Sequence, residues 1–141
     1  MKKSITLSLA AALLAAPAFV LKSEDLEELR KKNFERLMAT KQCFSCDLAN
    51  VNFSGIDLSN TTLANAHLVQ ANLKGLNLRT ATFTGADLRR ANLSNTDLTG
   101  AVLLNAKLDY ADFTNAKLCN TVMPDGQRIF QDCSRDMKKD E

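Results

Sequence analysis

The chain has 141 residues, enough for one domain, with 18 Lys and Arg, 16 Asp and Glu, one His and no Trp. Its formal net charge is +2, but Lys2 and Lys3 lie in a segment that we expect to be removed, which leaves 16 basic and 16 acidic residues. A neutral protein lacks the excess positive charge on which nonspecific nucleic-acid binding depends, so we expect no nucleic-acid partner.

Residues 1–18 have the three-part order of a secretory signal peptide. "MKK" is a positively charged start, "ITLSLAAALLAA" is an apolar stretch, and "APA" forms a cleavage pattern that ends at Ala18. The apolar stretch is shorter than the about 20 residues that a spanning helix needs. The alternative is a buried N-terminal helix, which the order of the three parts disfavours. We therefore predict export through the Sec pathway, a mature chain that starts at Phe19, and no stable membrane insertion after cleavage.

Residues 19–45 predict an N-terminal helical cap. The segment "SEDLEELRKKNFERLMATKQC" offers Ser23 as an N-cap, acidic residues in the first turn, and two Glu–Lys pairs four residues apart. We expect the apolar half of this helix to cover the domain that follows, although binding to a membrane or a partner helix is an alternative. The apolar half consists of Leu26, Leu29, Phe34, Leu37 and Met38.

Large apolar residues recur at every fifth position of the following segment. Five residues rotate a helical side chain by about 500°, and an odd step places successive strand residues on opposite faces, so neither structure buries all of them. A chain that turns a corner after each step can point every fifth residue at a common axis, and four corners close a coil. The predicted core ladder is Leu48, Phe53, Leu58, Leu63, Leu68, Leu73, Leu78, Phe83, Leu88, Leu93, Leu98, Leu103, Leu108, Phe113 and Leu118, and Met123 extends it by one position.

The neighbours of the ladder positions agree with such a coil. The residue two before each ladder position is mostly small, as expected for a narrow core. Ile56 and Leu76 break this rule twenty residues apart, and we expect a local bulge of the wall that they share. Two residues after the ladder position, Gly or Asn is frequent, and both tolerate the positive φ of a type II turn. We expect another turn type at the four remaining corners, Gln70, Thr80, Arg90 and Tyr110.

The pentapeptides "ANLKG", "ADLRR", "ANLSN" and "ADFTN" resemble the pattern A-[D/N]-L-x-x of the pentapeptide-repeat family. The resemblance implies an all-β solenoid over residues 46–123, a right-handed, four-sided parallel β-helix. At strand spacing, just under four coils give a rod on the order of 18 Å long. A short helix followed by a CxxC motif and "CDL" also resembles exported members from cyanobacteria and the chloroplast lumen. This second resemblance implies a location in the thylakoid lumen or the periplasm.

Residues 124–141 predict a C-terminal cap and tail. A Pro-Asp-Gly turn precedes Ile129 and Phe130, and we expect the tail to fold back on the outward-facing apolar residues of the last coil. Those residues are Val102, Leu104 and Val122.

The four cysteines lie in two groups. In the coil, Cys46 and Cys119 are 119 − 46 = 73 residues and therefore roughly 17 Å apart, too far for four sulfurs around one zinc ion. An even count in an exported chain favours disulfides. We predict Cys119–Cys133 as a staple of the C-terminal cap and Cys43–Cys46 as a local bridge. A CxxC motif can also be a redox pair, but Cys46 occupies an inward repeat position without a thioredoxin-like context.

Outward residues twenty apart should stack into ladders. One ladder contains Asp47, His67, Asp87 and Lys107, in which the His lies between two carboxylates. Asp47, His67 and Asp87 are thus a candidate weak metal site, and the favoured interpretation is a solvated charge ladder.

A second ladder is expected to form hydrogen bonds between stacked amides along its wall. It consists of Asn52, Asn72, Asn92 and Asp112. We also expect Arg89 to form a surface ion pair with Asp109 in the next coil.

Three functional classes compete. An enzyme is disfavoured, because no Ser-His-Asp or Cys-His set can be argued, no glycine-rich phosphate loop is present, and a packed narrow core leaves no cleft. Relatives that inhibit topoisomerases by mimicking DNA imply an acidic cytosolic rod, whereas residues 46–123 hold six acids and six bases behind a signal peptide. We therefore expect a non-catalytic, exported structural or protein-interaction scaffold without a cofactor. Its partner should be another protein, and its two caps favour a monomer.

Overall fold

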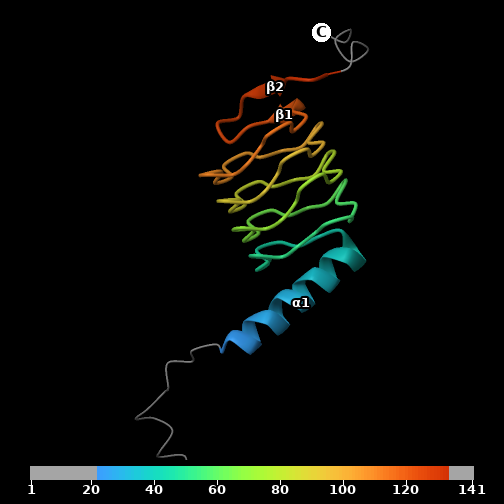
Figure 1. Cartoon of the computed structure of the whole chain (residues 1–141). Coiled ribbons are helices and arrows are strands. Elements are labelled where there is room, and N and C mark those ends of the chain that lie inside the picture. Colours follow the sequence, from blue (N-terminus) through green and yellow to red (C-terminus); the bar gives the residue numbers. More distant parts are fainter. Residues whose placement is uncertain (1–21, 134–141) are drawn as a thin grey trace, which may run out of the picture.

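The computed structural model describes residues 22–133 (Figure 1). Helix α1 (Ser23–Thr40) is followed by a stack of coils and by two short antiparallel strands, β1 (Cys119–Val122) and β2 (Arg128–Phe130). The predicted signal peptide, residues 1–18, lies outside the described residues, as does the tail from residue 134. Within 22–133, no helix has the length and apolar character needed to cross a membrane.

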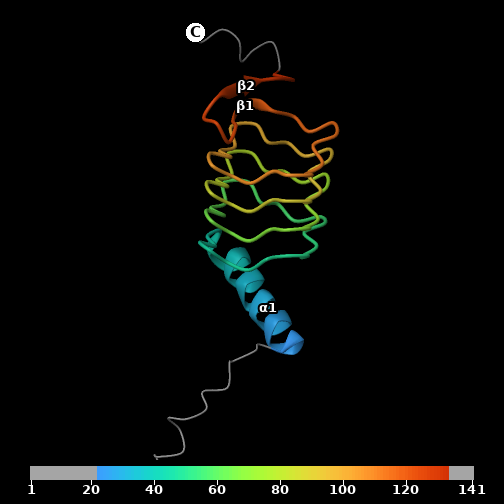
Figure 2. The same cartoon turned by 90° about the vertical axis from the view of Figure 1, so that its left-hand side faces the viewer.

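The coils repeat every twenty residues. Parallel bridges join residues that are twenty apart, and one unbroken line of them runs through Gln42, Thr62, Thr82, Val102 and Val122. Both views show the coils stacked on one another between α1 and β1 (Figures 1 and 2). The period of five in the apolar residues is therefore a quarter of the structural period.

Backbone hydrogen bonds between coils hold this stack together. The N–H of Leu68 donates to the carbonyl of Asp87 at 2.8 Å, and the N–H of Asp87 donates back to the carbonyl of Ala66 at 2.9 Å. The same pair of bonds recurs around each coil, so the walls form parallel ladders although each wall is only a few residues long.

The core lies along the axis of the stack. The ladder residues from Leu48 to Leu103 are all 0% exposed, and the alanines at inward positions such as Ala71 and Ala86 are buried beside them. The last ladder residues are only partly buried, because fewer layers follow them. These are Leu108, Phe113, Leu118 and Met123.

Every corner of the stack has a left-handed residue, including the four for which we expected another turn type. The φ angles of Gln70, Thr80, Arg90 and Tyr110 lie between 56° and 60°, so that expectation is wrong. At three of the four corners the stacking explains the difference. The N–H of Gln70 donates to Arg89 O at 3.0 Å, that of Thr80 to Thr99 O at 2.9 Å, and that of Arg90 to Asp109 O at 3.0 Å. These bonds fix the corner geometry even where the side chain disfavours it, at a cost of about 1–2 kcal/mol per residue.

The wall that contains Ile56 and Leu76 is irregular. In the stack as described, neighbouring lines of bridges are continuous, but the bridge between Asp57 and Asn77 is absent. The N–H of Leu58 still donates to Asn77 O, at a longer 3.2 Å. Leu76 is buried and Ile56 is half-buried, which agrees with the expected bulge at the two large inward residues.

Helix α1 begins one residue differently from our expectation. Its N-cap is Lys22, and Ser23 is the first helical residue, so the prediction of Ser23 as N-cap is wrong. The Asp25 carboxylate accepts a hydrogen bond from the backbone N–H of Lys22 at 3.1 Å, which selects this start.

Only the C-terminal half of α1 covers the first coil. Leu37 is fully buried, Phe34 and Met38 pack against the core, and the Phe34 and Phe53 rings have centroids 5.7 Å apart. Leu29 is 42% exposed. Figure 2 shows the N-terminal half of α1 projecting away from the coils. The predicted apolar face is therefore used over half of its length.

The chain folds back after the last coil, as expected, but it pairs with the edge of the coil. β2 runs antiparallel to β1, with Cys119 opposite Phe130 and Val122 opposite Arg128. The N–H of Asn105 donates to Pro124 O at 3.0 Å, which joins the turn between the strands to the coil below. Phe130 remains 48% exposed.

Candidate functional site

Carboxylate and amide side chains directly before the ladder residues hydrogen-bond to the turn that follows them. Asn52 Oδ1 accepts from Ser54 N at 3.1 Å, and Asp112 Oδ1 accepts from Thr114 N at 2.9 Å. These are Asx turns, and they give a physical reason for the frequent Asp or Asn directly before the ladder residue. The pattern A-[D/N]-L contains this signal, which an interpretation of these residues as surface ladders misses. The bond recurs at Asp47, Asp57, Asn72, Asn77, Asp87, Asn92 and Asp97.

The expected amide ladder is present in part. Asn72 Nδ2 donates to Asn52 Oδ1 of the previous coil at 3.0 Å. Asn52 Oδ1 also accepts from Ser54 Oγ at 2.6 Å, and Asn92 Oδ1 accepts from Ser94 Oγ at the same distance. At Asn52, the local turn bonds and the bond between coils share one acceptor oxygen.

The Asx turns lower the pKa of several aspartates. The Ser59 backbone N–H lowers the pKa of Asp57, the Thr114 hydroxyl and N–H lower that of Asp112, and the Arg89 side chain lowers that of Asp87. Because these pKa values are below those of the unfolded chain, the carboxylates contribute stability above the ordinary Asp pKa of about 3.9. That contribution is lost as the pH falls through the lowered values.

We expect the urea midpoint of unfolding to be constant from about pH 7 to pH 5 and to fall below about pH 4. The matched variant is D57N/D112N, because an amide oxygen accepts the same turn bond without titrating. This variant should show a shallower loss at low pH. An equally steep loss would contradict a role for the Asx turns in acid stability.

The candidate metal ladder is aligned but does not converge. Bridges place Asp47 beside His67 and His67 beside Asp87, as predicted. However, Asp47 Oδ2 accepts from Arg30 Nε at 3.2 Å, and Asp87 forms an ion pair with Arg89. Over residues 22–133, no three His, Cys, Asp or Glu side chains are grouped around a possible metal position. The ladder thus carries hydrogen-bonded ion pairs.

The expected ion pair between Arg89 and Asp109 is wrong. Arg89 Nη2 and Nε bind the two oxygens of Asp87 at 2.7 and 2.8 Å. Asp87 Oδ1 accepts a hydrogen bond from the backbone N–H of Arg89, so the two side chains are held close within one repeat. Arg89 therefore pairs with Asp87 and not with Asp109 of the next coil. Asp109 acts on Arg89 only as a more distant favourable charge.

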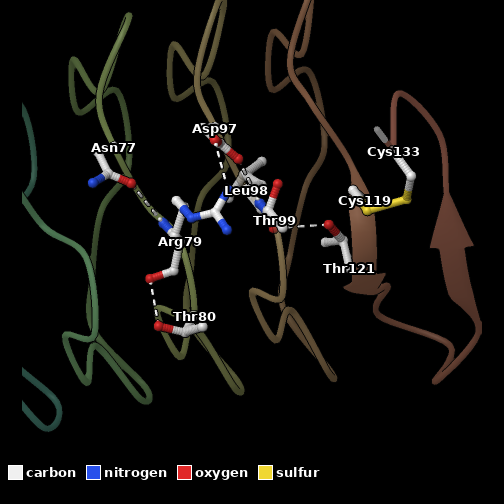
Figure 3. A network of polar contacts seen from close by, with 9 residues as sticks. All are labelled: Asn77, Arg79, Thr80, Asp97, Leu98, Thr99, Cys119, Thr121 and Cys133. Atoms are coloured by element: carbon white, nitrogen blue, oxygen red, sulfur yellow. Dashed lines mark hydrogen bonds and ion pairs between the residues drawn. A yellow bond between two sulfur atoms is a disulfide. The ribbon is translucent and has the colours of Figure 1, made fainter. Parts of the chain in front are cut away.

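The four cysteines form two disulfides at opposite ends of the stack. Cys43–Cys46 lies where α1 passes into the first coil, and both residues are buried. Cys119–Cys133 joins β1 to the segment that follows β2. Figure 3 shows Cys119–Cys133 at the end of a polar wall in which Arg79 Nη1 binds Asp97 Oδ2 at 3.2 Å.

One corner of the stack carries exposed, large side chains in consecutive coils. We call it the corner ridge; it consists of Val69, Gln70, Arg89, Arg90, Asp109 and Tyr110, which line a hollow of about 560 Å³. Tyr110 is 86% exposed, and the Arg90 guanidinium carbon lies 5.9 Å from the centre of its ring. Gln70, Arg90 and Tyr110 stack twenty residues apart, and all three are left-handed.

Comparisons with known proteins agree with this architecture. The family description "Pentapeptide repeat region" matches residues 38–113. The crystal structure of alr5209, a pentapeptide repeat protein from Nostoc PCC 7120, is 31% identical with a TM-score of 0.57, covering 71% of this chain and 78% of that one. A search of curated proteins found no match.

Two further solved structures are less similar. HetL, described as a pentapeptide repeat protein involved in heterocyst differentiation regulation in Nostoc sp. strain PCC 7120, is 30% identical, with a TM-score of 0.40. The match covers 62% of this chain and 51% of HetL. AT2G44920 from the Arabidopsis thaliana thylakoid lumen is 26% identical, with a TM-score of 0.26, covering 72% of this chain and 74% of that one.

These observations agree on one assignment. The twenty-residue coils, the corner every five residues and the Asx turns are the structural form of the pattern A-[D/N]-L-x-x. Proteins with this pattern fold as right-handed, four-sided β-helices and are generally non-catalytic structural proteins. The family match covers more than half of the chain, from residue 38 to residue 113, and the chain therefore belongs to the pentapeptide-repeat family.

Proposed function

We propose that this protein is a non-catalytic, exported scaffold that binds another protein through the corner ridge. The observation that carries the proposal is the run of left-handed Gln70, Arg90 and Tyr110 at one corner of successive coils. Gly or Asn would be less strained there, and strained backbone that persists is a feature of functional sites. A strained residue also occurs singly at Thr80, but only at this corner do three such residues follow one another in successive coils, which supports a use for their side chains.

The chemistry of the corner ridge is that of a protein-binding surface. Tyr and Arg are the side chains most enriched among residues that dominate binding energy. Here an exposed Tyr110 stacks beside Arg90, and both border a shallow hollow instead of a deep cleft. The shallow shape of the hollow favours recognition of a protein surface over turnover of a small substrate, and the sequence offers no Ser-His-Asp or Cys-His set for catalysis.

The rest of the proposal follows the sequence. We propose a signal peptide at 1–18, a helical cap at 19–45, the β-helix at 46–123 and a disulfide-stapled cap and tail at 124–141. Export would place the protein in the thylakoid lumen or the periplasm, and disulfides suit either compartment. Two caps support a monomer, because each covers an end at which coils of another copy would stack.

The test compares binding by three forms of the mature protein. We expect R90N/Y110N to lose the partner that the wild type retains after crosslinking in the native host. The control is T80N, because Thr80 is another left-handed corner residue outside the ridge. Relief of the left-handed strain should contribute roughly 1 kcal/mol per corner. This gain offsets the loss of the Thr80–Asn60 hydrogen bond in T80N and of the Arg90–Tyr110 contact in R90N/Y110N, so both variants should stay folded.

Retention of the same partner by R90N/Y110N would reject the corner ridge as the binding surface. Loss of binding in T80N as well would indicate that rigidity of the corners, and not the ridge chemistry, governs the interaction. Urea unfolding of each variant, followed by far-UV circular dichroism, checks that both variants are folded.

A further inference from the structure

The Cys43–Cys46 disulfide has an arginine directly against it. Arg36 Nη2 lies 2.7 Å from Cys46 Sγ and 3.9 Å from Cys43 Sγ. Both cysteines are nearly inaccessible, at 0% and 2% exposure, whereas Arg36 is exposed and reaches the two sulfurs from the surface. Within residues 22–133, Arg36 has no carboxylate at ion-pair distance, so no acidic side chain competes with the two sulfurs for its charge.

A guanidinium at this distance changes the chemistry of the disulfide. A positive neighbour stabilises a thiolate far more than a neutral sulfur, so it favours the reduced pair over the oxidised one. It also makes the nearer sulfur the better leaving group in thiol–disulfide exchange. The nearer sulfur is Cys46, by 2.7 Å against 3.9 Å.

We propose that Cys43–Cys46 is a redox-active disulfide that exchanges with a dithiol reductant, an activity that goes beyond the scaffold function. A thiolate of the reductant attacks Cys43 Sγ, the bond between the two sulfurs breaks, and its electron pair moves to Cys46 Sγ as a thiolate beside Arg36. The mixed disulfide joins the first sulfur of the reductant to Cys43 Sγ. The second thiolate of the reductant attacks that first sulfur and releases Cys43 as a thiolate. The reductant leaves as a disulfide, and the protein gains two electrons; Cys43 takes up a proton.

Helix α1 controls access to this site. Cys43 Sγ contacts the carbonyl of Asn33 at 3.5 Å, and the side chain of Asn33 donates to Asp47 O at 3.1 Å. Arg30 Nε binds the Asp47 carboxylate at 3.2 Å and completes the attachment of α1 to the first coil. A hollow of about 310 Å³, lined by Arg30, separates the projecting half of α1 from this coil. Attack on Cys43 therefore requires α1 to lift from the coil.

The first experiment locates the attacked sulfur without any substitution. Oxidised mature protein is treated with excess glutathione, quenched with acid, alkylated and digested, and the adducts are assigned by mass spectrometry. We expect glutathione on Cys43 and the alkyl group on Cys46. Glutathione predominantly on Cys46 would overturn the proposed direction of exchange.

The second experiment measures the equilibrium in glutathione redox buffers. We expect R36Q to shift the equilibrium of Cys43–Cys46 towards the disulfide by about tenfold, which corresponds to about 30 mV. R36K keeps the positive charge, so its equilibrium should lie between those of R36Q and the wild type. The control is R79Q, because Arg79 forms an ion pair on a distant wall. An R36Q equilibrium equal to that of the wild type, with the folded state verified by circular dichroism, would overturn the role of Arg36.

The same samples report on Cys119–Cys133. We expect this disulfide to stay oxidised in buffers that reduce Cys43–Cys46, and reduction of both at the same potential would reject a dedicated redox site.

The third measurement is the rate at which dithiothreitol reduces Cys43–Cys46. R30Q should accelerate it severalfold by loosening α1, whereas R79Q should not, and an unchanged rate in R30Q would reject α1 as the gate.

Discussion

Replacement of Phe83 by alanine is expected to lower the free energy of unfolding by about 3–5 kcal/mol. Phe83 is 0% exposed and lies in the middle of the stack, with coils on both sides. Its neighbours cannot collapse into the cavity, because Phe83 N donates to Val102 O at 2.7 Å and equivalent bonds fix each wall. The narrow core therefore keeps the whole cavity that the missing ring leaves.

The matched control is Phe113→Ala, the same change at another ladder position. Phe113 is only partly buried, so it loses less contact, and we expect a cost below about 2 kcal/mol. Urea unfolding followed by far-UV circular dichroism measures both, since a chain with one Tyr and no Trp has weak intrinsic fluorescence. Equal costs at the two positions would show that the core is no better packed in the middle than at its end.

Removal of the Cys119–Cys133 disulfide is expected to cost about 3 kcal/mol in the double variant C119A/C133A. The bridge spans a sequence separation of 14, and the short β2 has few other attachments: Arg128 and Phe130 are exposed, and only Ile129 is half-buried. Without the bridge, β2 should detach from β1 in a fraction of the molecules. Hydrogen exchange at the amides of β1 and β2 would then be faster than in the coils.

The control for the disulfide is Arg128→Ala in the same hairpin. It removes the hydrogen bond from Arg128 Nη1 to Asn120 Oδ1, 2.7 Å long and exposed, and should cost about 0.5 kcal/mol. If C119A/C133A cost no more than R128A, the disulfide would not be the main attachment of the hairpin. Unchanged exchange in β1 and β2 would lead to the same conclusion.

The repeat pattern predicted the coil well, because one residue type recurs under one physical constraint. Leu68 and Leu88 stand twenty residues apart in sequence and occupy the same place in successive coils, so the period alone gives the wall to which each residue belongs. Asp47 and His67 were placed side by side by the same arithmetic. Contacts fixed by backbone register can thus be predicted from spacing.

Side-chain choices within that register could not be predicted. Gln70 and Arg90 adopt left-handed corners because backbone hydrogen bonds to the next coil outweigh their local preference. Arg89 selects Asp87 over Asp109 because an Asx turn first brings Asp87 close. Both outcomes depend on competition between neighbours, which a list of propensities does not contain.

The candidate redox site could not be predicted from the sequence for a related reason. The CxxC motif is visible, but Arg36 is separated from Cys46 by ten residues and by the end of α1. The contact depends on the angle at which α1 meets the first coil. The spacing of the repeats does not determine how a helix packs on the first coil. The contact between the Arg36 guanidinium and Cys46 Sγ is therefore visible only in the structure.

The twenty-residue coil makes the length of this protein a modular quantity. Insertion of a whole coil would lengthen the rod by about 4.8 Å and return every later residue to its original wall. Insertion of one pentapeptide would preserve the core equally well but would turn everything beyond it by a quarter of a revolution. Arg90 and Tyr110 would then no longer stand above Gln70, although every leucine stayed buried. Selection for a buried core alone therefore tolerates insertions of any multiple of five residues, whereas selection for a surface that spans several coils tolerates only multiples of twenty.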